Sequence, residues 1–460
     1  MAKRRRQNTK IPKELIECEI LRLGHDGRGI AKKEGKTQFV EGALPGEIVK
    51  AKYISQRSKF DELNTVEILN ISPERVDPPC QHAEICGGCS LQYMSVSAQI
   101  SYKQRVLSEQ FKHFGSLSPE QWIEPLIGAT EGYRSKARLG VVYVGKRDEV
   151  IIGFREKRNK LITNIERCEV LDSRVGHQLS NLRNLIASLS IRQGIPQIEV
   201  AMGDDSVALV IRHMSPLTED DLSKITTFAK KLSFDVYLQP GDANSVHKVW
   251  PEKSSDRLHY ALSTTESEHT NRKLALAFHP TDFTQVNTGV NRQMVTRALE
   301  WLDIQRTDRV LDLFCGLGNF TIPMACLALE VIGIEGSETM VERGRENAEL
   351  NALNNVSFES ANLQADFTKA AWVKKGFDKI LIDPPRSGAL DIVNHISKFK
   401  AQRIVYVSCN PATLARDAGI LVDKGYTLSK AGVMDMFPHT SHVESVALFV
   451  RENKKRGTNG

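Results

Sequence analysis

Short runs of alternating apolar and polar residues fill the first part of the chain. Clear examples are residues 15–20 and 48–54, separated by a glycine-rich turn. Alternation with a period of two is typical of half-buried strands. Several such strands within about 60 residues predict a small OB-like β-barrel over residues 13–72. Residues 1–12 are polar, basic and without periodicity, so we expect a disordered tail there.

The pattern becomes mixed after the prolines at positions 73, 78 and 79. Segments with a 3.6-residue period alternate irregularly with short apolar strands, which predicts a central α+β domain over residues 73–282. We expect helices over 99–114, 174–189 and 219–232, and strands over 141–144, 150–154, 198–202 and 207–213.

A regular alternation of strands and helices occupies residues 283–452. Repeated βα units predict a parallel sheet covered on both faces, and hence an α/β, Rossmann-like C-terminal domain. Residues 453–460 read as a polar tail. The expected strands of this domain are 309–315, 331–335, 356–359, 379–383, 404–409, 426–434 and 445–451.

The positive charge of the chain is concentrated at its start. The net charge is +6, but residues 1–60 alone hold 15 Lys or Arg against 7 Asp or Glu. A basic module on a near-neutral remainder indicates nucleic-acid contact, although Arg4–Arg6 fit a solvated tail equally well. A second basic stretch covers 133–160. No apolar run approaches the ~18 residues of a membrane helix, and no apolar signal segment follows the basic start, so we expect a cytoplasmic protein.

Several strand ends in the C-terminal domain carry residues suited to a nucleotide-like ligand. Gly316 and Gly318 follow the first strand and allow the backbone to approach a ligand closely. Glu335 ends the next strand, where a carboxylate can accept both hydroxyls of an adenosine ribose. The glycine pair alone also fits an ordinary turn, but Asn362 and Asp383 fall at or just beyond further strand ends. The set fits a dinucleotide or S-adenosylmethionine.

Cys409 is a candidate nucleophile at the end of another strand of this sheet. A single cysteine is more often a buried apolar residue. Here, however, Pro411 begins a helix just after it, and a helix N-terminus lowers a thiol pKa. A carboxylate, Glu444, lies at the start of the last strand. We therefore expect a reactive thiol paired with an acid–base group.

Four of the eight cysteines form a candidate metal site. Disulfides are not expected in a cytosolic chain, and four thiolates satisfy either structural zinc or an iron–sulfur cluster. Zinc ribbons usually contain two C-x-x-C knuckles, whereas this chain has one. The four residues are Cys80, Cys86, Cys89 and Cys168.

Three short motifs follow one another in the C-terminal domain: Asp383-Pro384-Pro385-Arg386, Ser408-Cys409-Asn410-Pro411 and His442-Val443-Glu444-Ser445. With the segment His279–Asn287 ahead of them, they resemble the RNA uracil-5-methyltransferase family. The resemblance implies methylation of uracil C5 with S-adenosylmethionine, Cys409 adding to C6 and Glu444 removing the C5 proton. Such addition has a chemical logic, because the resulting enolate makes C5 nucleophilic. The implied cofactor contacts are Gln285, Phe314, Asn319, Glu335, Asn362 and Asp383.

Two of these cofactor residues have simpler explanations. Phe314 fits a core strand residue nearly as well, and Asn319 fits the N-cap of the helix that follows it.

The N-terminal half resembles one branch of the same family. Residues 13–76 resemble a TRAM domain, an RNA-binding barrel, and the four cysteines resemble the [4Fe–4S] site of that branch, so iron–sulfur is preferred to zinc. The combination is similar to members that act on 23S ribosomal RNA. It implies an RNA partner, with no DNA and no membrane, and we expect a monomer.

Alternative functions remain open at this point. The same chemistry on another 23S uridine or on the tRNA T-loop is one. A non-catalytic RNA-binding factor in ribosome assembly is another, although the presence of both Cys409 and Glu444 argues against it. An iron–sulfur redox enzyme would need a second cofactor motif, which the sequence does not contain.

Overall fold

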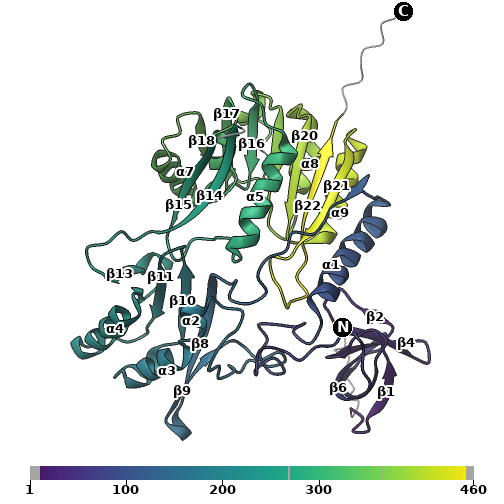
Figure 1. Ribbon diagram of the computed structural model, residues 1–460, viewed down its shortest axis with the longest axis vertical. Coiled ribbons are helices and arrows are strands. Elements are labelled where there is room, and N and C mark those ends of the chain that lie inside the picture. Colours follow the sequence, from purple (N-terminus) through teal and green to yellow (C-terminus); the bar gives the residue numbers. More distant parts are fainter. Residues whose placement is uncertain (1–10, 268–269, 366, 452–460) are drawn as a thin grey trace, which may run out of the picture. The chain divides into compact units, whose positions relative to one another are not determined.

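The computed structural model describes residues 11–267, 270–365 and 367–451 (Figure 1). The chain forms two compact units. Unit 1 contains the described residues up to Glu84, with Gly88–Lys103 and Pro438–His442. Unit 2 contains Ile85–Gly87, Gln104–Phe437 and the residues from Val443 onward. Of the predicted tails, 453–460 and residues 1–10 of the N-terminal one lie outside the described residues.

Unit 1 contains the small β-structure predicted from the alternating pattern. Its six strands form one sheet in the order β1-β5-β6-β4-β3-β2, and β1 also packs against β3. Alternate residues point inward to a core that includes Cys18, Val40, Val49 and Leu63. The strands are β1 (Ile16–Glu19), β2 (Arg22–Leu23), β3 (Gly29–Lys33), β4 (Lys36–Glu41), β5 (Ile48–Gln56) and β6 (Phe60–Asn70).

The barrel is fastened to the segment that follows it. Arg75 binds the fully buried carboxylate of Glu47 through two nitrogens, at 2.6 and 2.9 Å, and also donates to the carbonyl of Gly42. Breaking a buried ion pair by removing one partner costs about 3–5 kcal/mol. The residues just after position 72 therefore belong to the same folded body as the barrel.

The first sheet of unit 2 has the strand order β13-β12-β11-β10-β8-β9. Helix α4 (Glu219–Leu232) has the predicted bounds, because Thr218 and Asp221 form a capping box at its start. The strands are β8 (Lys136–Val144), β9 (Glu149–Gly153), β10 (Gln197–Met202), β11 (Val207–Arg212), β12 (Asp235–Gln239) and β13 (His247–Trp250).

The helix predicted over 174–189 is wrong in one respect, because it consists of two pieces. These are α2 (Ser173–Gly176) and α3 (Leu179–Ser188). The backbone N–H of Cys168 donates to the carbonyl of Gly176. That carbonyl is directed at Cys168 rather than along a helix, so the first piece ends there.

The second sheet of unit 2 has eight strands in the order β18-β17-β16-β19-β20-β22-β21-β7 (Figure 1). The five strands β16 to β20 are parallel, as predicted, and β22 runs antiparallel between β20 and β21. The bounds are β7 (Gln121–Trp122), β16 (Arg309–Leu313), β17 (Glu330–Glu335), β18 (Val356–Ser360), β19 (Lys379–Ile382), β20 (Arg403–Ser408), β21 (Thr427–Met434) and β22 (Glu444–Val450).

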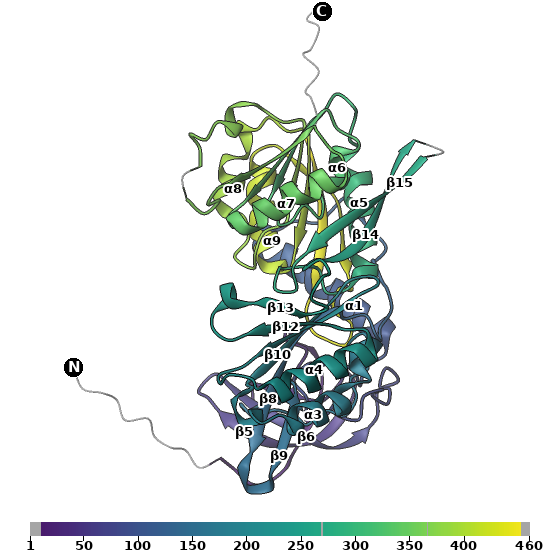
Figure 2. The same cartoon turned by 90° about the vertical axis from the view of Figure 1, so that its left-hand side faces the viewer.

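Helices cover this second sheet (Figure 2). Helix α5 packs on β19 and β20, α6 and α7 on β17 and β18, and α9 on β20, β21 and β22. The bounds are α5 (Thr288–Leu302), α6 (Thr321–Ala325), α7 (Glu338–Leu350), α8 (Leu390–His395) and α9 (Pro411–Asp423). Helix α1 (Val96–Gln110) begins in unit 1 and ends in unit 2. No helix within the described ranges combines the length and hydrophobicity needed to cross a bilayer.

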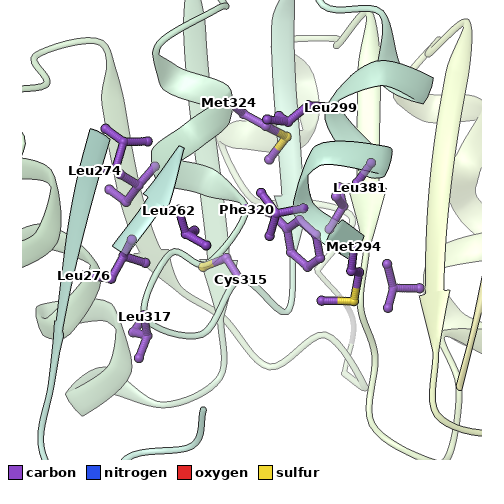
Figure 3. Packing of buried hydrophobic residues seen from close by; sticks show 14 of the residues in the cluster. Leu262, Leu274, Leu276, Met294, Leu299, Cys315, Leu317, Phe320, Met324 and Leu381 are labelled. Carbon is purple, nitrogen blue, oxygen red and sulfur yellow. The ribbon is translucent and has the colours of Figure 1, made fainter. Parts of the chain in front are cut away.

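A two-stranded hairpin, β14 (Leu258–Ser267) and β15 (Thr270–Phe278), was not predicted and packs against the second sheet's helices. Leu262, Leu274 and Leu276 of the hairpin share one hydrophobic cluster with Phe320 and Met324 around α6 (Figure 3). Side chains of α7 and of the residue just after it satisfy the edge of β15. The amides of Asn347 in α7 and Asn351 at its C-terminal end form hydrogen bonds with the backbone of Ala277 and Ala275. These side chains take the place of a neighbouring strand.

Candidate active site

The predicted site residues lie at one edge of the second sheet because its strands β16 to β20 are parallel. The carboxyl ends of parallel strands share an edge, where α/β sheets bind ligands. Gln285 follows none of these strands and belongs to the loop between β15 and α5. The others follow their strands in turn: Phe314 and Asn319 after β16, Glu335 at the end of β17, Asn362 after β18, Asp383 after β19 and Cys409 after β20.

A cavity of about 290 Å³ opens at this edge. Three of the predicted cofactor residues line it: Phe314, Glu335 and Asn362. Sequence reasoning missed its other lining residues, although they flank Glu335 and Asn362 in the chain. Those residues are Gly336, Ala361, Leu363 and Gln364.

The carboxylate of Glu335 is held in one orientation by the backbone. It accepts hydrogen bonds from the N–H groups of Gly316 (3.1 Å), Gly336 (2.7 Å) and Ser337 (3.1 Å). The bond from Gly316 ties the glycine turn after β16 to the end of β17. This arrangement fits the predicted ribose-binding carboxylate, since a fixed acceptor group lines the cavity.

Phe314 adopts a conformation that is rare for an aromatic residue. Its φ is +65°, in the left-handed region, where a bulky side chain is strained. The backbone N–H groups of Phe314 and Cys315 both donate to the carbonyl of Ile334, which holds the turn. The ring is half-buried and lines the cavity. The alternative of a core strand residue is therefore wrong, and strain of this kind is typical of functional sites.

The remaining cofactor candidates lie outside the lining of this cavity. Asn319 exchanges two 2.9 Å hydrogen bonds with the amide of Asn291 and accepts a third from the hydroxyl of Tyr260. It does not cap α6, whose N-cap is Phe320, so that alternative is wrong. Gln285 is half-buried, and its neighbour Val286 is bonded to Ser135.

Cys409 and Glu444 come together through the pairing of β20 with β22. Ser408 lies directly opposite Ser445 in this antiparallel ladder. Cys409 follows Ser408 and Glu444 precedes Ser445, so the two residues come together just beyond the last pair of the ladder. The carboxylate of Glu444 is near enough to the thiol of Cys409 to raise its pKa. Two residues 35 positions apart in the sequence are thus neighbours at the edge that carries the cavity.

The thiol of Cys409 is not activated in the way the sequence indicated. Its pKa is raised to about 11, mainly by burial and then by the carboxylates of Glu444 and Asp383, while Arg386 partly opposes them. The predicted lowering by the helix N-terminus is therefore wrong, because burial and the carboxylates of Glu444 and Asp383 outweigh it. Burial also raises the pKa of Asp383, to about 7.

Comparison with known proteins identifies the family. The family model for tRNA (uracil-5-)-methyltransferase matches residues 95–452, and the TRAM domain model matches residues 14–56. The chain belongs to the uracil-5-methyltransferase family.

Curated relatives match along almost their whole length. The 23S rRNA (uracil(1939)-C(5))-methyltransferase RlmD of Alcanivorax borkumensis is 53% identical, over 99% of this chain and 100% of the relative. That of Hahella chejuensis is 53% identical, over 96% and 99%. Among solved structures, the Pyrococcus abyssi tRNA (uracil-54, C5)-methyltransferase in complex with S-adenosyl-L-homocysteine covers 95% of this chain and 100% of its own, with a TM-score of 0.72 at 24% identity. It shares the fold.

The loop that carries the family motif Asp383–Arg386 is anchored to α9. The side chain of Asn410 caps α9 by accepting from the N–H of Ala412, and its amide nitrogen donates to the carbonyl of Arg386. The carboxylate of Asp417 accepts from the N–H of Ala389. One asparagine thus joins the loop after β19 to the helix after β20. Arg386, which acts on the Cys409 thiol, had no assigned role in the sequence prediction.

The four cysteines of the predicted cluster are divided between the two units. Cys80 is half-buried and the other three are buried. Cys80 and Cys89 belong to unit 1, whereas Cys86 and Cys168 belong to unit 2. Across residues 11–451, apart from the three undescribed positions, no group of three or more His, Cys, Asp or Glu side chains is arranged to hold a metal. The predicted cluster stays a prediction.

The reactivity of Cys409 provides a first test of this electrostatic picture. Only the thiolate reacts with an alkylating agent, so iodoacetamide labelling of Cys409 should accelerate as pH rises toward about 11. Replacing Glu444 with glutamine removes a negative charge and should lower the pKa of the thiol. A pKa that is lower by about one gives about tenfold more thiolate, and so about tenfold faster labelling, at neutral pH. Mass spectrometry of the Cys409 peptide measures the rate.

Glu349→Gln is the control for this labelling experiment. It removes a carboxylate from the exposed face of α7 and should leave the rate at Cys409 unchanged. Equal rates for all three proteins would contradict the picture.

Proposed function

We propose that this protein methylates carbon 5 of a uracil in 23S ribosomal RNA, at the uracil-1939 site named for its relatives, with S-adenosylmethionine as methyl donor. The observation that carries the proposal is that Cys409 and Glu444 are neighbours at the strand edge that also bears the cavity. A nucleophile and a nearby carboxylate are the two groups that substitution at uracil C5 requires.

Cys409 acts first in the proposed mechanism. The thiol first loses its proton to water, its sulfur then forms a bond to C6 of the uracil, and the C5–C6 π electrons move to C5 and the O4 carbonyl as an enolate. The loss of the thiol proton is the demanding part, since burial and two carboxylates raise the pKa of Cys409 to about 11. Arg386 already favours the thiolate, because its positive charge lowers the pKa of the Cys409 thiol. Any group that excludes water from the site would have to leave this stabilisation of the thiolate in place.

S-adenosylmethionine, when bound, supplies the methyl group to C5 and leaves as S-adenosylhomocysteine. Phe314, Glu335 and Asn362 would hold its adenosine part, because a half-buried ring, a fixed carboxylate and an amide line one cavity. Gln285, Asn319 and Asp383 are proposed to complete the contacts.

Glu444 acts last. Its carboxylate removes the proton from C5, the C5–C6 double bond forms again, and the sulfur of Cys409 leaves C6 with its electron pair. The proximity of the two residues suits this elimination, since the base and the leaving sulfur must both reach adjacent ring carbons. The sulfur leaves as a thiolate and recovers a proton from the protonated Glu444, so the products are the methylated uracil, S-adenosylhomocysteine and the free thiol of Cys409.

We propose that the N-terminal barrel binds RNA. It matches the TRAM domain model over residues 14–56, and residues 1–12, which precede it, carry the excess positive charge of this part of the chain. Phosphate contacts dominate nucleic-acid affinity, and the target base must leave its stack at a cost of a few kcal/mol. Contacts away from the catalytic edge can offset that cost. We further propose that the protein acts as a monomer and does not act on DNA.

The test of the proposed function is methyl transfer to isolated RNAs. Purified 23S ribosomal RNA should accept a methyl group and release tritium from labelled uracil C5, whereas tRNA should not. Methylation of tRNA alone would favour the T-loop as substrate. Binding to ribosomal RNA without tritium release would favour the non-catalytic assembly factor.

We also propose that Cys80, Cys86, Cys89 and Cys168 hold a [4Fe–4S] cluster. Support comes from the donor chemistry, since four thiolates satisfy one cubane cluster, and from the sequence spacing with a single C-x-x-C pair. No step of the reaction is assigned to it.

Anaerobically purified protein should be brown and contain about four irons per chain. Serine at any one of the four cysteines should lower the iron content and the melting temperature together, because the missing thiolate leaves the cluster one ligand short. Cys18→Ser, outside the set, should leave the iron content unchanged. Stoichiometric zinc in place of iron would overturn this assignment.

A further inference from the structure

Strand β22 begins at Glu444 in unit 2, and the turn that precedes it in the chain belongs to unit 1. Residues Pro438–His442 are part of unit 1, whereas β22 starts at Glu444, two residues later. The turn contains a strained residue: His439 has a φ of +65° and is only 5% exposed. A non-glycine residue persists in this region only when its surroundings hold it there.

Gln99 of helix α1 supplies much of that hold. Its side-chain oxygen accepts a 2.8 Å hydrogen bond from the N–H of His439, and its nitrogen lies 3.3 Å from Nδ1 of the same residue. The nitrogen also donates to the carbonyls of Leu91 and Met94. Gln99 is 1% exposed. A buried amide that spans two chain segments in this way fixes both of them.

Ser90 and Leu91 hold the same turn from the other side. Their backbone N–H groups both donate to the carbonyl of His439, at 2.9 Å, and the hydroxyl of Ser90 accepts from the N–H of Ser441. The barrel adds a close contact: a Cβ on Gly27 would lie 3.1 Å from Leu91 and 3.2 Å from Ser441. The turn before Glu444 is therefore held by groups on both sides, all of them within unit 1.

We propose that Gln99 and Ser90 are positioning residues for the removal of the C5 proton. They fix the turn Pro438–His442 and so determine where Glu444 enters β22. Neither residue needs to touch the uracil, because the effect passes through Val443, the single residue between the turn and the strand. The inference rests on the proposed function, since it concerns the proton that Glu444 removes.

The test is Gln99→Leu, which keeps the approximate size of the side chain and removes its hydrogen bonds. A base displaced by about 1 Å can slow its step by up to about a hundredfold, while the nucleophile and the cofactor cavity are unaffected. The variant should show about tenfold to hundredfold lower kcat with an unchanged KM for RNA. It should also accumulate the methylated RNA–protein adduct on a denaturing gel, which simple loss of folded protein would not produce.

Matched variants separate positioning from stability. Gln104 lies on the same helix, and its side-chain oxygen has no hydrogen-bond partner among the described residues. The variant Gln104→Leu should therefore behave like the unchanged protein. Ser90→Ala should accumulate less RNA–protein adduct than Gln99→Leu. Ser90→Thr, which retains a hydroxyl acceptor, should release the methylated RNA as the unchanged protein does. Thermal unfolding and iron content are measured for each variant.

The outcomes are distinct. Adduct with Glu444→Gln but none with Gln99→Leu overturns the positioning role and leaves the proposed function intact. No adduct with either variant overturns the assignment of Glu444 as base, and the inference with it. Adduct with both, and none with Gln104→Leu, supports the inference.

Discussion

Replacing Glu444 with glutamine is expected to leave the protein covalently attached to its RNA. The sulfur of Cys409 can still add to C6 and the methyl group can still reach C5, but glutamine cannot accept the C5 proton, so elimination stalls. Loss of a general base lowers a rate by about 10²–10⁴, and turnover should fall by that amount. A denaturing gel with labelled RNA and S-adenosylmethionine should show a shifted band containing protein, RNA and methyl group.

The double variant Cys409→Ala/Glu444→Gln is the control for this trap. It has no sulfur to form the bond, so the shifted band should disappear while RNA binding under native conditions persists. A band that survives in the double variant, or that never forms in Glu444→Gln, would count against the assigned roles.

The single change Cys409→Ala is expected to abolish methyl transfer and leave the fold intact. Cys409 is only half-buried, and the cap of α9 is made by Asn410 rather than by the thiol. Stability should therefore change little. Loss of a covalent nucleophile costs on the order of 10⁶-fold in turnover, since C5 of uracil is then never made nucleophilic. Tritium release and methyl incorporation into 23S ribosomal RNA both measure it.

Cofactor binding distinguishes this loss from misfolding. S-adenosylmethionine affinity, measured by calorimetry, should match that of the unchanged protein, because the cavity lined by Phe314 and Glu335 contains no atom of Cys409. Cys326→Ala, a buried cysteine of the same unit, should keep its turnover below its melting temperature. Residual methylation by Cys409→Ala at more than a trace would exclude the covalent mechanism.

The local pattern of the sequence determined most of the architecture. The strand–helix alternation predicted the parallel strands β16 to β20, and the confirmed bounds of α4 follow from the capping residues at its start. The motifs around Asp383, Cys409 and Glu444 indicated the family, which the comparison with its members confirmed. These predictions succeed because hydrophobic periodicity, helix caps and glycine turns each depend on a few consecutive residues.

Tertiary structure decided what depends on residues far apart in the chain. The antiparallel insertion of β22 between β20 and β21 brings Glu444 next to Cys409, just beyond the paired residues Ser408 and Ser445, and this neighbourhood depends on strand pairing between distant parts of the chain. The same burial that brings the carboxylates near the thiol raises its pKa, whereas the sequence pattern indicated a lowered one. The hydrogen bond between Gln99 and the N–H of His439 joins residues that are 340 positions apart in the sequence. Such contacts are selected by packing and by the need to satisfy buried polar groups, and no local pattern records them.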